Sequence, residues 1–373
     1  MAIITAPAAG RLRMDLFNFD RLTDFDSVIV TQTSSLLAID VDGYRYAFSG
    51  TGVRYNSFGE PISGAITGFR FTQGSTVLFE ANGFSVDASL FYLLTYAPND
   101  PLTLLLAGND DYRGGALADV VRDVFGHNVI MGGGDSDVLT GGNGNDHIYG
   151  QSPSGGPDGG DLLNGGGGSD YLQGNAGRDT IDGGSGSDRI QGGADDDSIL
   201  GGAGHDVING NRGRDSIQGG SGNDALRGGQ DDDTIQGGEG DDLIMGDRGI
   251  DRLEGGSGRD VFLFGPDSAP VGPDIQAIDR ILDLSTVDDV LSLGFRPEAI
   301  LEGSVSTSLA EAQALAQSLL DQRAGNHEVA LIRLSGANDA VLFWSQDGGA
   351  TVNAAVALGA SFVTGSLAFD DFI

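Results

Sequence analysis

Aspartate recurs at a fixed spacing of nine residues through the middle of this chain. From Gly132 the sequence advances in fourteen nonapeptide units, interrupted once by the six residues GQSPSG at 150–155. The sixth residue of every unit is aspartate: Asp137, Asp146, Asp161, Asp170, Asp179, Asp188, Asp197, Asp206, Asp215, Asp224, Asp233, Asp242, Asp251 and Asp260. Carboxylate oxygens are ligands for hard divalent cations. The spacing therefore indicates a row of similar cation sites.

The eighth residue of every unit is large and apolar, and it identifies the element that positions the carboxylate. These residues are Leu139, Ile148, Leu163, Leu172, Ile181, Ile190, Ile199, Ile208, Ile217, Leu226, Ile235, Ile244, Leu253 and Phe262. We expect each unit to form a turn of six residues and then a short strand whose middle side chain points inward. A disordered Gly/Asp-rich linker has no reason to keep Ile and Leu in phase with Asp.

Such a coil is too weak to fold on apolar burial alone. One buried Ile or Leu contributes roughly 1.5 to 3 kcal/mol, whereas ordering the backbone costs about 1 to 2 kcal/mol for each residue. Residues 132–263 also contain 25 Asp and Glu against 8 Arg. A cation between the turns would add the missing stabilisation and would neutralise the excess negative charge. Sites built from carboxylate and turn carbonyl oxygens suit Ca²⁺ better than Mg²⁺, which demands a near-ideal octahedron.

The units resemble the RTX, or haemolysin-type, calcium-binding repeat with its GGxGxDxUx consensus. The resemblance implies an all-β fold with a right-handed parallel β-roll, in which two successive nonapeptides form one coil. It also implies that aspartates two units apart share a Ca²⁺ ion with turn carbonyls, giving about ten ions in all. Some units depart from the consensus. Asp135, Asp195 and Asp231 replace the fourth glycine, while Asn175, Asn211, Asp247 and Pro157 replace the second. Asp and Asn tolerate the left-handed conformation, whereas proline does not.

Weaker units flank the array. Residues 114–122 and 123–131 keep the apolar eighth position, with Asp119 and Asn128 in sixth place as weaker candidate metal ligands. After the array, Asp279 and Asp288 continue the pattern loosely and are candidate ligands for the last ions.

The chain divides into four predicted segments. Residues 1–104 are expected to form a small β-rich cap, with a hairpin at Asp42-Gly43 and a short helix over 87–97. Its aromatic residues indicate either a core or a carbohydrate-binding or partner-binding surface. Degenerate entry turns follow over 105–131, and the roll spans 132–265. Residues 266–373 should form an α+β cap, with a helix over 308–322 that Ser308 caps and strands over 328–334 and 340–346.

Composition excludes several functions. The formal charge of −34 and the pI near 4.1 argue against nucleic acid and anionic membranes as partners. The chain has no Cys, and all 20 of its basic residues are Arg, so thiol and lysine chemistry are excluded. No apolar run is long enough to span a membrane. HExxH and GxSxG motifs are also absent, and His147 and His205 occupy free repeat positions. We therefore expect a non-enzyme.

The route out of the cell and the biological role are further expectations. The first residues do not resemble a conventional signal peptide. The last residues, SLAFDDFI, resemble the C-terminal export signal of RTX proteins that leave Gram-negative cells through a type I ABC exporter. Extracellular modules bind Ca²⁺ at about 10⁻⁴ to 10⁻³ M, which favours folding outside the cell. The role is either a structural or adhesive component of a surface, matrix or biofilm, through glycan binding or self-association, or a diffusible toxin-like effector. An undetected hydrolase is a third alternative.

Overall fold

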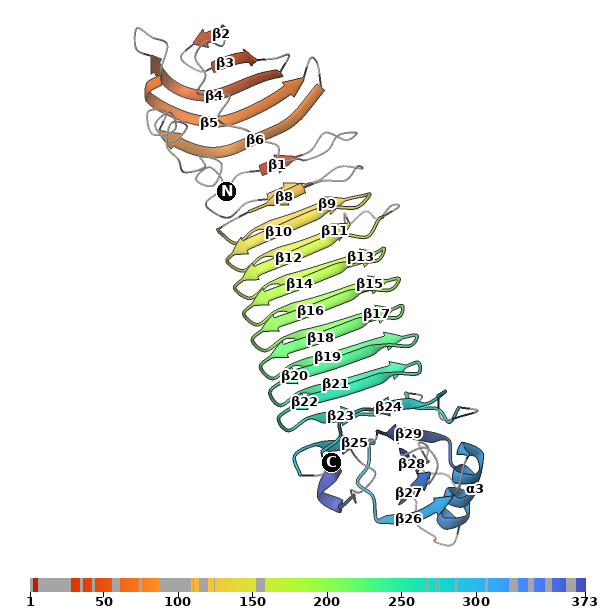
Figure 1. Cartoon of the computed structure of the whole chain (residues 1–373). Coiled ribbons are helices and arrows are strands. Elements are labelled where there is room, and N and C mark those ends of the chain that lie inside the picture. Colours follow the sequence, from red (N-terminus) through yellow and green to blue (C-terminus); the bar gives the residue numbers. More distant parts are fainter. Residues whose placement is uncertain are drawn as a thin grey trace. The chain divides into compact units, whose positions relative to one another are not determined.

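The computed structural model, drawn in Figure 1, divides into two compact units, Met1–Gly183 and Gly184–Ile373. Before residue 90 only the backbone of six strands is described. Beyond them the described residues are 109, 111–113, 120–123, 125–151, 158–265, 268–272, 274, 276–285, 287–305, 308–321, 328–334, 339–345, 351–359 and 367–373.

The first unit begins with an antiparallel sheet. Its strands are β2 (Val28–Thr33), β3 (Leu36–Val41), β4 (Tyr44–Tyr55), β5 (Pro61–Gln73) and β6 (Thr76–Asp87). Val41 pairs with Tyr44, which confirms the predicted hairpin at Asp42-Gly43. β1 (Ile3–Thr5) pairs antiparallel with β6 and parallel with β7 (Asp111–Arg113). It thereby links this sheet to the coils. The aromatic side chains of the sheet, and the predicted helix after residue 87, lie outside the described residues.

The coils of the first unit form two parallel ladders. One ladder contains β7, β9 (Val129–Gly133), β11 (His147–Gln151) and β13 (Tyr171–Ala176). The other contains β8 (Val120–Arg122), β10 (Val138–Asn143) and β12 (Leu162–Gly167). Leu139 pairs with Leu163, and Ile148 with Leu172, although each pair is separated by eighteen residues plus the six-residue insertion. The extra residues therefore leave the phase of the repeat unchanged, as predicted. Their predicted bounds, 150–155, are wrong at the start, because Gly150 and Gln151 belong to β11 and Gln151 pairs with Gly133 in the ordinary register.

The second unit continues the same construction. β14 (Thr180–Ser185) spans the boundary between the units in sequence. One ladder contains β15 (Arg189–Ala194), β17 (Val207–Arg212), β19 (Ala225–Gln230), β21 (Leu243–Arg248), β23 (Val261–Leu263) and β25 (Val290–Ser292). The other contains β16 (Ser198–Ala203), β18 (Ser216–Ser221), β20 (Thr234–Glu239), β22 (Arg252–Ser257) and β24 (Asp279–Ile281). Strands pair with their second neighbours along the chain, so two nonapeptides form one coil. The predicted parallel β-roll is confirmed.

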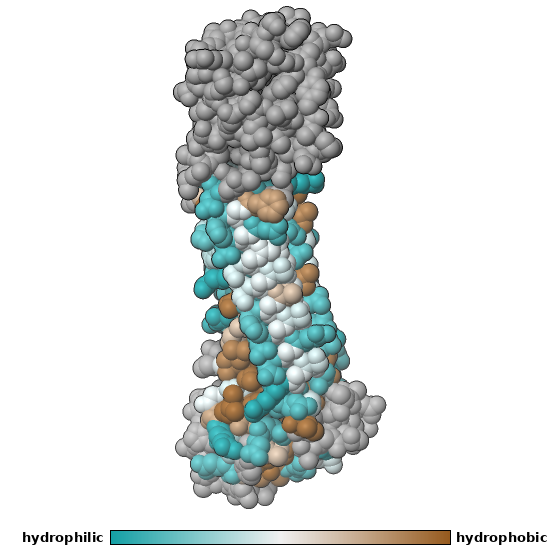
Figure 2. All heavy atoms as spheres, turned by 90° about the vertical axis from the view of Figure 1, so that its left-hand side faces the viewer, coloured by the Kyte–Doolittle hydropathy of each residue, from teal (hydrophilic) through white to brown (hydrophobic). Residues whose placement is uncertain are grey.

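The core of the coils is a stack of the eighth-position side chains. All fourteen are at most 2% exposed. Tyr112, Val121 and Ile130 extend the buried stack before the array, and Ile281 and Leu291 extend it afterwards. Each coil therefore adds two apolar residues to the interior, while its remaining residues form turns or face outward. Figure 2 shows hydrophilic and near-neutral residues over most of the array surface on the face displayed.

A mixed sheet and one helix end the second unit. β29 (Ala354–Leu358) pairs with β24 and with β28 (Asp339–Trp344), and β27 (Glu328–Leu334) joins β28 to β26 (Ala299–Val305). Helix α3 (Leu309–Leu320) buries Leu309, Ala312 and Ala316, and the Ser308 side chain caps it by accepting from the backbone N–H of Glu311 (3.2 Å). These elements confirm the predicted helix and strands. A 3₁₀ turn, η4 (Phe369–Asp371), precedes the buried Phe372.

No helix within the described part of the chain is both long and apolar enough to cross a membrane.

Candidate metal centre

Each turn of the array takes a conformation that brings its backbone carbonyls against the next coil. Glycines at the second and fourth positions, except Gly159, have positive φ; Gly204, for example, has φ +135° and Gly222 has φ +123°. A Cβ added at either residue would lie 1.7 Å from the carbonyl oxygen of the residue eighteen positions earlier. The carbonyls of one turn thus pack against the backbone of the turn two units later.

The residues that replace these glycines adopt the same conformation. In the described chain six residues that are not glycine also have positive φ, at values of 67° to 81°: Asp135, Asn175, Asp195, Asn211, Asp231 and Asp247. These six are the Asp and Asn substitutions found at the second and fourth positions of the repeat. Because Asp and Asn accept the left-handed region more readily than other side chains, the turns stay intact. The prediction for these substitutions is confirmed, and Pro157 lies outside the described residues.

The sixth-position carboxylates form hydrogen-bonded rows. The backbone N–H of Asp188 donates to Oδ1 of Asp206 at 2.8 Å, and Asp206 donates in the same way to Asp224. The bond recurs from Asp224 to Asp242 at 2.8 Å and from Asp242 to Asp260 at 3.0 Å. A second row runs from Asp197 through Asp215 and Asp233 to Asp251. All fourteen aspartates are at most 3% exposed.

The second carboxylate oxygen of the same residues is buried without a hydrogen-bond donor from the protein. This holds for Oδ2 of Asp146, Asp161, Asp206, Asp215, Asp224, Asp233, Asp242, Asp251, Asp260 and Asp279 among the described residues. A Cβ built on Gly219 would lie 2.5 Å from Oδ2 of Asp224 and 2.6 Å from the carbonyl oxygen of Gly237. Two acceptor oxygens therefore converge on one small space.

The turn at Asn128 shows what this space requires. Asn128 occupies the sixth position of its unit, and its amide Nδ2 donates to the carbonyl oxygen of Gly141 at 3.2 Å. Gly141 stands to Asn128 as Gly237 stands to Asp224, thirteen residues further along the chain. An amide supplies its own hydrogen to the facing carbonyl, but a carboxylate has none. Each aspartate turn therefore needs either a proton or a cation between the two oxygens.

The electrostatics of the buried aspartates support the same conclusion. Burial is the main reason that the pKa of Asp233 is raised to about 9; the hydrogen bond from the Asp215 backbone opposes this rise, and the charges of Asp251, Asp215 and Asp231 add to it. Burial likewise raises the pKa of Asp242 to about 7 and of Asp279 to about 8. A buried carboxylate that has no cation beside it favours its protonated form. A divalent cation would reverse this effect and hold the groups ionised.

Comparison with known families agrees with this geometry. A family model of the RTX calcium-binding nonapeptide repeat, which describes four copies, matches at residues 124–152, 156–190, 182–217, 200–235, 218–253 and 236–268. Residues 124–268 are an RTX repeat array. RTX repeats bind calcium, and their β-roll is structural rather than catalytic. No curated protein matches the chain.

The chemistry of the RTX array fits Ca²⁺ as its ion. The oxygens that converge at a turn are a buried carboxylate Oδ2 and a backbone carbonyl, as at Asp224 and Gly237, so the donor set is entirely oxygen. Within the described residues no three His, Asp or Glu side chains gather at one point. Backbone carbonyls must therefore complete each shell, and Ca²⁺, with six to eight oxygen ligands in flexible geometry, tolerates such a mixture best. Bound there, the ion would supply the positive charge that the carboxylate rows lack.

The residues that flank the RTX array differ in how they fit its rows. Asp279 is 1% exposed, and its Oδ1 accepts from the backbone N–H of Asp251 at 2.9 Å, so it continues one row. Asp288 is exposed. Its neighbour Asp289 takes the row position instead and accepts from the Asp260 backbone N–H at 3.1 Å. The predicted position is therefore corrected by one residue, because Val290 pairs with Val261 and places the preceding residue against Asp260. Asp119 lies outside the described residues.

The sequence did not predict a further row of hydrogen bonds, which is separate from the carboxylate rows and involves the fifth position of the RTX turns. The backbone N–H of Asn223 donates to Nδ1 of His205 at 2.8 Å, that of Asp241 donates to Oδ1 of Asn223 at 3.1 Å, and that of Arg259 donates to Oδ1 of Asp241 at 2.9 Å. These side chains are exposed, as expected for His205. The fifth position is Ser, Asn, His, Asp, Arg, Gly or Ile, and only the first four of these have a side-chain acceptor. The row therefore has no fixed residue that the sequence alone would reveal.

Proposed function

We propose that this protein is secreted, folds on Ca²⁺ outside the cell, and acts as a structural or adhesive component of a cell surface, matrix or biofilm. The observation that carries the proposal is the row of buried carboxylate oxygens that face carbonyl oxygens with no donor between them. Such a coil is unfavourable without a cation and favourable with one. Calcium would therefore determine whether the central segment is unfolded or folded into the β-roll.

This coupling suits export in the unfolded state. Cytosolic free Ca²⁺ is too low to load sites with the affinity of extracellular modules, about 10⁻⁴ to 10⁻³ M. The chain would remain unfolded in the cytosol, pass a type I ABC exporter of a Gram-negative cell, and fold in the calcium-rich medium. RTX repeat proteins are typically secreted.

A structural or adhesive role is supported by what the array presents to solvent. Positions seven and nine of each unit lie on the outward face of a strand and repeat with every coil, so the roll displays parallel rows of side chains. Repetition of this kind suits contact with a repeating partner, such as a polysaccharide or a second copy of the chain. The repeats themselves form a structural module, which favours a role in binding over catalysis.

Electron microscopy of the purified chain with and without millimolar CaCl₂ tests the proposal. A matched variant with Asp206, Asp224, Asp242 and Asp260 changed to Asn would lack four consecutive carboxylates of one row. We expect ordered assemblies, or binding to isolated cell-surface material, for the wild-type protein in calcium only. Lysis of target cells or uptake into them by a non-adhering monomer would instead establish the effector alternative.

A further inference from the structure

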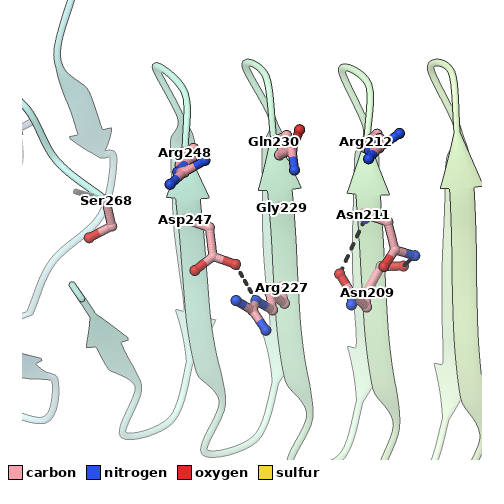
Figure 3. Close-up of a pocket in the computed structure, with 9 residues that line it drawn as sticks. All are labelled: Asn209, Asn211, Arg212, Arg227, Gly229, Gln230, Asp247, Arg248 and Ser268. Atoms are coloured by element: carbon pink, nitrogen blue, oxygen red, sulfur yellow. Dashed lines mark hydrogen bonds and ion pairs between the residues drawn. The ribbon is translucent and has the colours of Figure 1, made fainter. Parts of the chain in front are cut away.

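A polar trough lies on the outward face of the second unit, over three neighbouring strands of one ladder. It has a volume of about 460 Å³, within the range typical of ligand sites, and Figure 3 shows its lining residues on β17, β19 and β21 with Ser268 beside them. Its other lining residues are Asn209, Asn211, Arg212, Arg227, Gly229, Gln230, Asp247 and Arg248. No aromatic residue contributes to it.

The trough is positively charged within a strongly acidic chain. Three arginines and one aspartate line it. Asp247 forms an ion pair with Arg227, which leaves Arg212 and Arg248. Both are exposed, and in the described chain neither has a carboxylate within ion-pair distance. The formal charge of the whole chain is −34, so two uncompensated guanidinium groups in one hollow are a local exception. The charge indicates an anionic occupant.

The register of the strands sets the spacing of these groups. Arg212 pairs with Gln230 across β17 and β19, and Gln230 pairs with Arg248 across β19 and β21. Two strand spacings separate the arginines, about 10 Å between their backbones. The Gln230 amide lies between them, and the side chain of Asn209 stands beside Arg227 in the row below, as Figure 3 shows.

These groups match one ligand chemistry. Guanidinium binds carboxylate in a two-pronged, charge-assisted manner, and side-chain amides donate to and accept from hydroxyl groups. Nucleic acid is a poor occupant because its dense phosphate charge would be repelled by the acidic chain around the trough. A sugar chain with at most one carboxylate on each ring offers sparse negative charge together with many hydroxyls. An open trough also admits a chain, whereas an enclosed pocket would select a single small molecule.

We propose that this trough binds a carboxylated sugar chain, with Arg212 and Arg248 each pairing with a carboxylate and Asn209 and Gln230 bonding to hydroxyls. The inference gives the proposed adhesive function a ligand class, and it rests on that function for its biological meaning. The binding itself is measurable independently of the biological role.

Isothermal titration of the full chain in millimolar CaCl₂ provides the test, with galacturonate tetramer as the probe. Probe and protein are equilibrated at the same free calcium, because the probe itself binds calcium. The test variants are Arg212→Gln and Arg248→Gln, since glutamine already occupies the equivalent turn position at Gln230. The matched control is Arg252→Gln, which changes an exposed strand arginine on β22 that does not line the trough.

We expect the wild-type protein and R252Q to bind equally. Each trough variant should bind about threefold or more weakly and the double variant at least tenfold more weakly, and binding should weaken as NaCl rises. A neutral maltotetraose should not bind. Equal affinity of R212Q/R248Q and the wild-type protein would overturn the proposal. So would tighter binding of a sulfated heparin tetrasaccharide than of galacturonate, or equal binding of free acetate, because either result names a different ligand.

Failure of this inference differs from failure of the proposed function. Calcium-dependent assembly or adhesion that persists in R212Q/R248Q would show that the trough is not needed for adhesion, and the proposed adhesive function would stand. Galacturonate binding by a protein that never adheres would support the trough ligand and contradict the adhesive function.

Discussion

The sixth-position aspartate carries two opposed requirements in a single side chain. Its Oδ1 accepts a backbone hydrogen bond that registers one coil on the next, as between Asp206 and Asp224. Its Oδ2 faces a carbonyl oxygen and has no donor from the protein. The first interaction needs only an acceptor, whereas the second needs a positive charge. An amide oxygen can also accept a backbone hydrogen bond, and at Asn128 the amide Nδ2 donates to the Gly141 carbonyl oxygen and so removes the second need.

This division predicts opposite effects of Asp224→Asn in the two calcium states. In chelator the amide can donate to the Gly237 carbonyl, so the variant should be more stable than wild type by about 1 kcal/mol. In millimolar calcium it should be less stable by about 2 kcal/mol, because one shell loses a carboxylate ligand. Circular dichroism in chelator, where the variant should show more β structure than the wild-type protein, and thermal unfolding in calcium measure the two signs.

The matched control for this change is Asp232→Asn. Asp232 is an exposed fifth-position aspartate whose Oδ1 accepts from the Ile250 backbone, and an amide oxygen can replace it there. It should be nearly neutral in both states. A loss of stability in D224N that is the same with and without calcium would contradict the assignment of Oδ2 to the metal.

The raised pKa values predict the pH dependence of the calcium-free protein. Burial raises the pKa of Asp242 to about 7, of Asp279 to about 8 and of Asp233 to about 9, from an ordinary value of 3.8. A group with a raised folded-state pKa stabilises the fold fully below its unfolded pKa, and that stability is lost as pH rises through the folded value. The calcium-free array should therefore gain β structure as pH falls from about 9 to 4.

In the presence of calcium, protons compete with the ion for the same oxygens. Because protonation also stabilises the calcium-free fold, the calcium concentration at half-folding should fall as pH falls from 7 to 5, and fewer ions should be bound on folding. Circular dichroism during calcium titrations at several pH values, with a calcium electrode to count the bound ions, measures both quantities. A half-folding concentration and an ion count that both stay constant over this range would show that the buried carboxylates do not hold the ion.

At the scale of the element, the turn depends on backbone shape more than on residue identity. Six Asp and Asn residues replace glycine at positive φ without changing the path of the chain. The limit is set by space and conformation together: a side chain must accept the left-handed region and must clear the carbonyl of the preceding turn. Gly204 lies at φ +135°, outside the region those six residues adopt.

Gly204→Ala should therefore destabilise the calcium-loaded protein by about 2 kcal/mol or more, because its Cβ would lie against the Gly186 carbonyl oxygen. Ser221→Ala is the control, since alanine already occupies the same third turn position at Ala203. It should be neutral. Urea unfolding in millimolar calcium compares the two variants, and equal midpoints would show that the turns are not packed as closely as described.

The elements that the sequence predicts well are those that the nine-residue period constrains. Position eight identifies the core, position six the buried carboxylate, and the substituted positions two and four the left-handed turns. Local chemistry alone predicts a hairpin at Asp42-Gly43 and a helix start at Ser308. The pairing of Val41 with Tyr44 confirms the hairpin, and the Ser308 cap confirms the helix start.

Features outside that period could not be predicted in the same way. After the array, strand pairing spans 28 residues from Leu253 to Ile281 and 29 from Phe262 to Leu291, so Asp289 rather than Asp288 aligns with Asp260. The fifth-position row is built from several residue types, and the trough from side chains that no repeat position fixes. These depend on register, which only the folded chain displays.

For the whole molecule, the central claim is that calcium closes the coils. The described apolar interior of the array consists of one residue for each nonapeptide, and the acidic residues of the array outnumber its arginines. Apolar burial alone does not offset the ordering of nine residues in each unit. The ion would supply the missing stabilisation, so that calcium binding and folding become one event.

Hydrogen exchange of the amides of residues 132–263, measured by mass spectrometry in millimolar calcium and in excess chelator at pH 7.5, tests this claim most directly. We predict strong protection of the strand amides in calcium and near-complete exchange within seconds in chelator. Equal protection of the array in both conditions would contradict the account.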